Sequence, residues 1–131
     1  MNRLEEEHIL RRVLVSRNWY DPNTGRVSPN AFRAEKHDTD GISVSLRRLR
    51  SAKQEGESGR NPAGYHVAEL PTSAVLTNSM TIEPSPVPEN PGHAHIPELN
   101  YENRKEDISY ERRQALADAV TGVHGPFTGS K

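Results

Sequence analysis

The stretch Ile42-Ser43-Val44-Ser45-Leu46 alternates strictly between apolar and polar residues. This alternation is typical of a β-strand with one buried face, because successive side chains of a strand point to opposite sides. A register slip by one residue would expose the whole apolar set. We therefore predict a strand at 42–46 whose apolar residues point into the core, while Ser43 and Ser45 face outward or into a pocket.

Other strands and helices are predicted on both sides of this stretch. Further runs of β-branched and apolar residues between turn signals predict strands at 9–15, 65–70, 80–82 and 93–96. Ser28 before Pro29 predicts a short helical turn at 29–32, a basic run predicts a short helix at 46–54, and Ser109 predicts the cap of a final helix. The sequence therefore predicts an α+β fold, with a short mixed or antiparallel sheet and a C-terminal helix in a small, loop-rich domain.

The length and composition predict one domain with a thin core. The chain has 131 residues, of which Leu, Ile, Val and Phe make up 25, close to the level at which chains become disordered. We place a single α+β domain at residues 1–121. Residues 122–131 contain three glycines and a proline, and we predict that they form a flexible C-terminal tail.

Charge, apolar run length and cysteine content together argue against several classes of function. The 17 basic residues nearly balance the 18 acidic ones, whereas proteins that bind nucleic acids usually carry a clustered positive excess. No apolar run is long enough to span a membrane, and the first residues do not resemble a signal peptide. The absence of cysteine excludes disulfides and thiolate chemistry. We expect a soluble, cytoplasmic protein without a cofactor.

His93 and His95 form the most suggestive pair of side chains. Two residues apart in a strand, both imidazoles point to one face and could contact one metal ion or phosphate. A zinc site would need a third ligand, and His66 and Glu98 are the candidates for it. The spacing alone is a weak signal, and the flanking Pro91 and Pro97 indicate an edge segment. We therefore expect the histidines to form hydrogen bonds at a sheet edge and to bind no metal.

A ligand site is a second interpretation of these residues. Arg12 (or its neighbour Arg11), Ser43 and the two histidines would line one cleft, with Ser45 on the same side of its strand as Ser43. Such a cleft would suit a nucleotide or another phosphate-bearing substrate. No serine lies in a Gly-x-Ser-x-Gly motif, so the sequence predicts no classical nucleophile.

Two resemblances bear on these hypotheses. An arginine on an early strand followed by a Ser-x-Ser strand loosely resembles ADP-ribosyltransferase folds, although the acidic residue that such enzymes require has no evident place. Several short stretches between residues 8 and 97 together resemble a group of small, uncharacterised bacterial proteins. These are Leu10-Arg11-Arg12-Val13, Gly25-Arg26-Val27-Ser28 with Ala31-Phe32, Asp40-Gly41-Ile42-Ser43-Val44, His66-Val67-Ala68-Glu69-Leu70 and Asn90-Pro91-Gly92-His93-Ala94-His95-Ile96. The second resemblance implies a bacterial, standalone domain and no particular activity.

Two functions therefore remain open after the sequence analysis. The thin core, the proline-rich segment at 84–91 and the absence of a complete catalytic motif favour a non-catalytic binding protein that docks to a protein partner in a bacterial complex. The alternative is a small enzyme acting on a nucleotide or phosphate-bearing substrate. The two differ in a spatial requirement, because the enzyme needs Arg12, Ser43 and the histidines close together.

Overall fold

A six-stranded antiparallel sheet forms the centre of the computed structural model, which describes residues 7–128. The strand order is β6-β7-β4-β1-β5-β8, so the first strand of the chain lies in the interior of the sheet. Each neighbouring pair is antiparallel. The strands are β1 His8–Leu14, β4 Ile42–Leu46, β5 Tyr65–Pro71, β6 Glu83–Pro84, β7 His93–Ile96 and β8 Gly122–Phe127.

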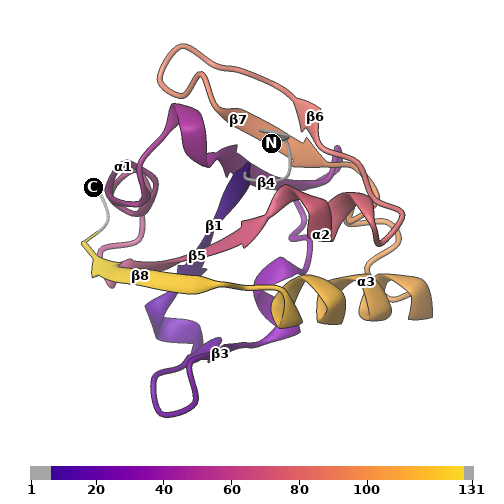
Figure 1. Cartoon of the computed structure of the whole chain (residues 1–131), viewed down its shortest axis with the longest axis horizontal. Helices are drawn as coiled ribbons and strands as arrows, with labels where there is room; N and C mark the ends of the chain where they lie inside the picture. Colours follow the sequence, from indigo (N-terminus) through magenta and orange to yellow (C-terminus); the bar gives the residue numbers. More distant parts are fainter. Residues whose placement is uncertain (1–6, 129–131) are drawn as a thin grey trace.

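Short helices and a small hairpin surround this sheet. Figure 1 shows α1 on one side of the sheet and α3 on the other. The α-helices are α1 Ala52–Glu57, α2 Thr72–Leu76 and α3 Asp107–Asp118, the 3-10 helices are η2 Val15–Arg17, η3 Pro29–Phe32 and η4 Arg47–Leu49, and the hairpin strands are β2 Tyr20–Asp21 and β3 Arg26–Val27. The predicted α+β class, with an antiparallel sheet and a C-terminal helix in one small domain, is confirmed.

The two faces of the sheet bury apolar residues against different elements. The larger core contains Ile9, Val13 and Val44 together with Leu116 of α3. On the opposite face, Leu10 of β1 packs in a smaller cluster, which also contains Ala52 of α1, Val67 and Phe127. We call these sides the α3 face and the α1 face. Alternation along each strand decides which face a side chain joins.

The predicted register of β4 is confirmed. Ile42 and Val44 are fully buried in the core of the α3 face, and Leu46 packs against that core while half-buried. Ser45 pairs with Leu10 of β1, so it lies on the α1 face. Its side chain is also buried, because it lies beneath a cleft rather than in solvent.

Of the three predicted helices, the first has the predicted boundaries, the last begins earlier, and the middle one is divided into two. Ser28 caps η3 as predicted, since its hydroxyl accepts the amide hydrogen of Asn30 at 3.1 Å. The final helix begins earlier than predicted: Glu106 is its N-cap residue and Ser109 lies buried inside the helix.

Within residues 7–128, none of the helices has the length and apolar character that crossing a membrane requires.

The helix predicted at 46–54 is instead divided. Residues 47–49 form η4, and α1 begins after Ser51 and extends to Glu57. Ser51 and Gln54 form a capping box, in which each side chain binds the other residue's backbone amide. This reciprocal cap fixes the start of α1 more strongly than the basic residues before it.

Two segments between β5 and β7 also differ from the prediction. Residues 72–76, for which the sequence analysis predicted no helix, form α2. The strand predicted at 80–82 lies slightly later, at Glu83–Pro84, where β6 pairs with His95 and Ala94 of β7. Met80 is buried in the core instead, so its apolar side chain reports burial rather than strand pairing.

The flexible tail predicted from residue 122 is wrong for residues 122–127. These residues form β8, which pairs with β5 at the edge of the sheet. A proline is tolerated on an edge strand, and Phe127 packs against the apolar cluster of the α1 face. His124 also binds Glu69 of β5 at 2.8 Å. Residues 129–131 lie outside the described part of the chain.

Candidate functional site

A cleft of about 330 Å³ opens on the α1 face beside β4 and β7. We call it the β4–β7 cleft. Four of the five residues that the sequence analysis selected for a ligand site line it, and they come from three different strands. These four are Arg12, Ser43, Ser45 and His93.

Sheet register explains why these side chains meet. Leu10 pairs with Ser45, and Arg12 and Ser43 follow on the same face of their two strands, where both line the cleft. Ser45 in turn pairs with His93 of β7. Alternation then directs all of these side chains to the α1 face. Of the residues that the enzyme hypothesis requires in one cleft, Arg12, Ser43 and His93 line it and His95 does not.

Arg12 supplies a partly free cation to the cleft. Its Nη1 donates a hydrogen bond to Ser58 Oγ at 2.7 Å, and its guanidinium carbon lies 5.6 Å from the centre of the Tyr65 ring. A guanidinium has five N–H donors, so this one hydrogen bond leaves most of them available. Arg60 adds a second, exposed cation to the wall of the cleft.

Arg11, which the sequence could not distinguish from Arg12, serves the opposite side of the sheet. Its Nε donates to the carbonyl oxygen of Ala31 at 2.9 Å and its Nη1 to that of Ser43 at 2.8 Å. Desolvation lowers the pKa of its guanidinium from the ordinary value. Arg11 therefore braces β1 against η3 and β4 and is not available to a ligand.

A buried polar network forms the floor of the cleft. Ser45 Oγ donates to Glu55 Oε1 at 2.8 Å and accepts from Asn90 Nδ2 at 2.9 Å. Arg50 Nε lies 2.9 Å from the same Glu55 oxygen. Ser45, Glu55 and Asn90 are only 1%, 5% and 7% exposed. Ser45 is thus a structural member of the site, because both of its hydroxyl roles are taken.

Glu55 also places a carboxylate where the sequence analysis found none. Its charge is balanced by Arg50 and its oxygen is hydrogen-bonded by Ser45. A buried carboxylate that is paired and hydrogen-bonded in this way fixes the positions of its neighbours. The arrangement makes Glu55 a positioning residue for the floor of the cleft rather than a free acid.

His93 is held at both ring nitrogens. Its Nδ1 lies 2.8 Å from the carbonyl oxygen of Ser85, and its Nε2 lies 3.3 Å from Ser43 Oγ. His95 touches the His93 ring edge to face, with 4.8 Å between the ring centres. His95 is not among the residues that line the cleft. Of the two histidines, His93 is the one presented to a ligand.

The candidate third metal ligands do not join this pair. His66 packs against the ring of Tyr20 at 4.7 Å on the α3 face, where burial lowers its pKa. Glu98 binds the backbone amide and hydroxyl of Thr81 at 2.9 and 2.8 Å. Among residues 7–128, no group of three or more His, Cys, Asp and Glu side chains is arranged to hold a metal ion.

A second ionisable cluster lies on the α1 face, around Glu69 of β5. Its carboxylate binds His8 of β1 through Oε2 and His124 of β8 through Oε1. Desolvation raises the pKa of this carboxyl, but the hydrogen bonds and charges of the two histidines outweigh it and lower the pKa below its ordinary value. We call these three residues the Glu69 clamp, because they connect three neighbouring strands. The sequence analysis missed the clamp, since its members are up to 116 positions apart.

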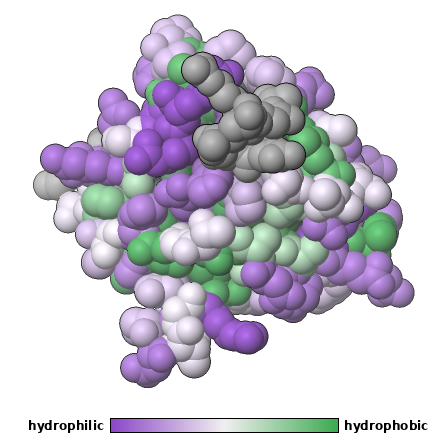
Figure 2. All heavy atoms as spheres, viewed as in Figure 1, coloured by the Kyte–Doolittle hydropathy of each residue, from purple (hydrophilic) through white to green (hydrophobic). Residues whose placement is uncertain are grey.

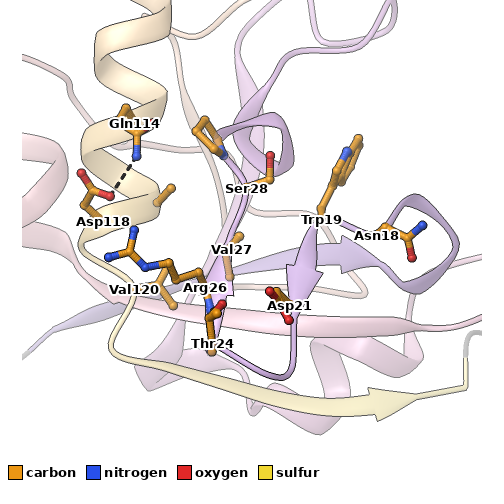
Figure 3. Close-up of a pocket in the computed structure, with 13 residues that line it drawn as sticks. Asn18, Trp19, Asp21, Thr24, Arg26, Val27, Ser28, Gln114, Asp118 and Val120 are labelled. Carbon is orange, nitrogen blue, oxygen red and sulfur yellow. Dashed lines mark hydrogen bonds between the residues drawn. The ribbon is translucent and has the colours of Figure 1, made fainter.

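A larger hollow of about 920 Å³ lies between the β2–β3 hairpin and the C-terminal end of α3. Figure 3 shows Arg26 reaching from β3 toward the last turn of α3, where Gln114 donates to Asp118 at 2.9 Å. Trp19 lines the hollow and packs against the core. The residues that line it include no histidine and no paired nucleophile and base. The smaller β4–β7 cleft therefore carries more chemistry.

Comparisons with protein-family models, with curated proteins and with solved structures found no match to this chain. The chemistry proposed for the cleft therefore depends on the residues that line it.

Proposed function

We propose that this chain binds a phosphate-bearing small molecule, of nucleotide type, in the β4–β7 cleft. The supporting observation is the convergence of Arg12, Ser43 and His93 from three strands on one cleft. Ligand pockets typically combine a modest volume with a few convergent polar groups, and a volume of about 330 Å³ lies within the usual range.

The charges of the cleft favour an anionic ligand. Arg50 is neutralised by Glu55, whereas Arg12 and Arg60 have no carboxylate among their ion pairs in the described part of the chain. The exposed Glu89 also lines the cleft, so three arginines face two glutamates and the lining has a net charge of +1. A guanidinium presents donors in a planar fork that matches two phosphate oxygens. The hydroxyl of Ser43 adds a neutral polar group beside them. This combination suits a phosphate group better than an apolar ligand.

A thermal-shift and calorimetric titration tests this proposal. We expect AMP or ADP to raise the melting temperature, whereas adenosine without phosphate has a smaller effect. Arg12→Gln should weaken binding about tenfold or more, since a charge-assisted pair is worth at least about 1.4 kcal/mol. Arg26→Gln is the matched control, because this exposed arginine lines the other hollow. If Arg26→Gln alone weakens binding, the ligand site is the larger hollow instead.

A second candidate function is docking to a protein partner in a bacterial complex. The observation that favours it is the exposure of large apolar side chains on α2 and α3: Leu76 is 58% exposed, Ile108 44% and Tyr110 60%. Figure 2 shows hydrophobic residues interspersed with hydrophilic ones over one face of the molecule. Exposed apolar and aromatic residues are common anchors of interfaces.

An affinity capture with three baits tests the docking function. A partner retained by the wild-type chain should be lost when Leu76 and Tyr110 are both changed to serine, because these residues supply the exposed apolar area. Leu49→Ser, which removes an exposed leucine from η4, is the control. Equal capture by all three baits would contradict docking through α2 and α3.

A further inference from the structure

The hydrogen bonds of the His93 ring determine which of its nitrogens carries the hydrogen in the neutral form. A carbonyl oxygen only accepts, so the 2.8 Å contact with the Ser85 carbonyl requires the hydrogen to be on His93 Nδ1. In the neutral ring, Nε2 then carries the lone pair. That lone pair lies 3.3 Å from Ser43 Oγ, whose hydroxyl hydrogen is available to donate to it. Hydrogen bonds thus connect the Ser43 hydroxyl to the His93 ring, and the His93 ring to the Ser85 carbonyl that orients it.

Sheet pairing holds this chain of groups in place. Ser43 belongs to β4, His93 to the adjacent β7, and Ser85 follows β6 on the far side of β7. Ser85 forms two hydrogen bonds with His93, because its amide also donates to the His93 carbonyl oxygen at 2.9 Å. The carbonyl oxygen of Ser43 accepts from Arg11 at 2.8 Å. Groups fixed on strands keep their geometry better than groups on loops.

The neighbouring serines do not have the same opportunity. Ser45 donates to Glu55 and accepts from Asn90. Ser58 Oγ donates to the carbonyl oxygen of Glu55 at 2.8 Å and accepts from Arg12. Among the three serines that line the cleft, Ser43 is therefore the one whose hydroxyl faces a basic nitrogen.

We propose that Ser43 is a nucleophile, with His93 as its general base, and that it attacks the phosphorus of a phosphate ester bound in the cleft. This inference deepens the proposed function, since it states what the same site does to a phosphate-bearing ligand. A nucleophile within reach of a base that a third group orients is the arrangement by which serine hydroxyls are activated.

The step balances without a further reactant. The Ser43 Oγ–P bond forms while the ester P–O bond breaks, and the Ser43 proton passes to His93 Nε2. His93 then gives this proton to the departing alkoxide, which leaves as an alcohol. Ser43 is left as a phosphoester and His93 returns to its neutral form. Arg12, which lines the same cleft as Ser43, would stabilise the negative charge on the phosphoryl oxygens.

Diisopropyl fluorophosphate tests the nucleophile, because Ser43 would displace fluoride while His93 takes the proton. We expect intact mass spectrometry to show one phosphoryl group per chain and peptide mapping to place it on Ser43. Ser43→Ala should abolish the adduct and His93→Gln should slow its formation by about 100-fold, the lower end of general-base effects. Ser73→Ala and His37→Gln, which change exposed residues outside the cleft, should label at the wild-type rate.

Several outcomes would overturn the inference: no adduct, an adduct on another serine, or unchanged labelling in His93→Gln. If Ser43→Ala does not fold, the peptide map of the wild-type chain decides which serine reacts. The nucleotide titration separates this inference from the proposed function. If AMP binds through Arg12 while Ser43 stays unlabelled, the binding function stands and the nucleophile does not. If the labelling of Ser43 depends on His93 but AMP does not bind, the nucleophile stands and the nucleotide-binding function does not.

Discussion

Gly56 of α1 lies directly against the ring of Phe127 in β8. A Cβ atom on residue 56 would lie 2.8 Å from Cγ and 2.9 Å from Cβ of Phe127, closer than such carbon atoms approach in proteins. The contact connects a helix that begins at residue 52 with the last strand described, and it completes the apolar cluster around Leu10 and Val67.

Gly56→Ala should therefore destabilise the protein. Alanine is worth up to about 1 kcal/mol more than glycine inside a helix, but overpacking costs about 1–3 kcal/mol, so we expect a net loss of about 1 kcal/mol. Urea unfolding measures it. Gly122→Ala is the control, since nothing lies within 4 Å of a Cβ at that position. Equal stability of the two variants would mean that Phe127 does not pack on α1.

Val44→Asp should cost more than about 3 kcal/mol of the free energy of unfolding. Val44 is fully buried in the core of the α3 face, and an unpaired carboxylate there loses its hydration without gaining a partner. Thermal unfolding provides the measurement. Leu76→Asp, at an exposed position on α2, should change stability by less than about 0.5 kcal/mol. An unchanged melting temperature for Val44→Asp would refute the register of β4.

Glu69→Gln should reduce stability at neutral pH but not at low pH. The folded pKa of Glu69 is lowered, so its ionised form stabilises the fold above the ordinary carboxyl pKa, and this contribution is lost as the pH falls through the folded value. The side chains of the clamp are partly exposed, so we expect a loss of about 1 kcal/mol at pH 7. The gap between variant and wild type should close below about pH 4.5. Glu102→Gln, at an exposed position, should show no such gap. A pH-independent difference would exclude the clamp as its cause.

Zinc and chelators should leave the melting temperature of the protein unchanged. Both ring nitrogens of His93 are engaged, and His66 and Glu98 bind elsewhere. Binding to the native state alone would raise the apparent stability. Differential scanning fluorimetry with zinc chloride and with EDTA checks this. Stabilisation by zinc that is lost in His95→Ala would contradict the expectation and indicate a metal site.

Local patterns predicted those parts of the fold that local chemistry controls. The alternation at 42–46 gave the strand and its buried face, and Ser28 with Pro29 gave η3. The tail prediction failed because glycine and proline oppose regular structure only on average. In β8, the pairing with β5 and the burial of Phe127 compensate for them. The pairing partners in β5 lie 53–62 positions earlier in the chain, and Leu10 and Ala52 of the apolar cluster lie farther away still, beyond the reach of a local pattern.

The candidate site shows the same division. Arg12, Ser43 and His93 were selected by residue type and by the side of the strand on which they lie. Glu55 and Asn90 were missed, because a glutamate in a polar helix and an asparagine between prolines resemble ordinary surface residues. Only the network with Ser45 reveals their role. The side-chain contact of Ser43 with His93 likewise depends on strand order, which the sequence analysis left open between mixed and antiparallel sheets.

The strand order has a consequence for how the chain is assembled during synthesis. β1 is made first, yet it lies between β4 and β5, so the sheet grows outward from it in both directions as later residues emerge. Pairing across such long separations makes folding slow compared with helical domains of this size. One direction ends with β7 and β6, and the other ends with β8. A nascent chain that has emerged as far as Thr121 already contains every residue of the β4–β7 cleft, but Phe127, which packs against Gly56 of α1, emerges only with the last strand.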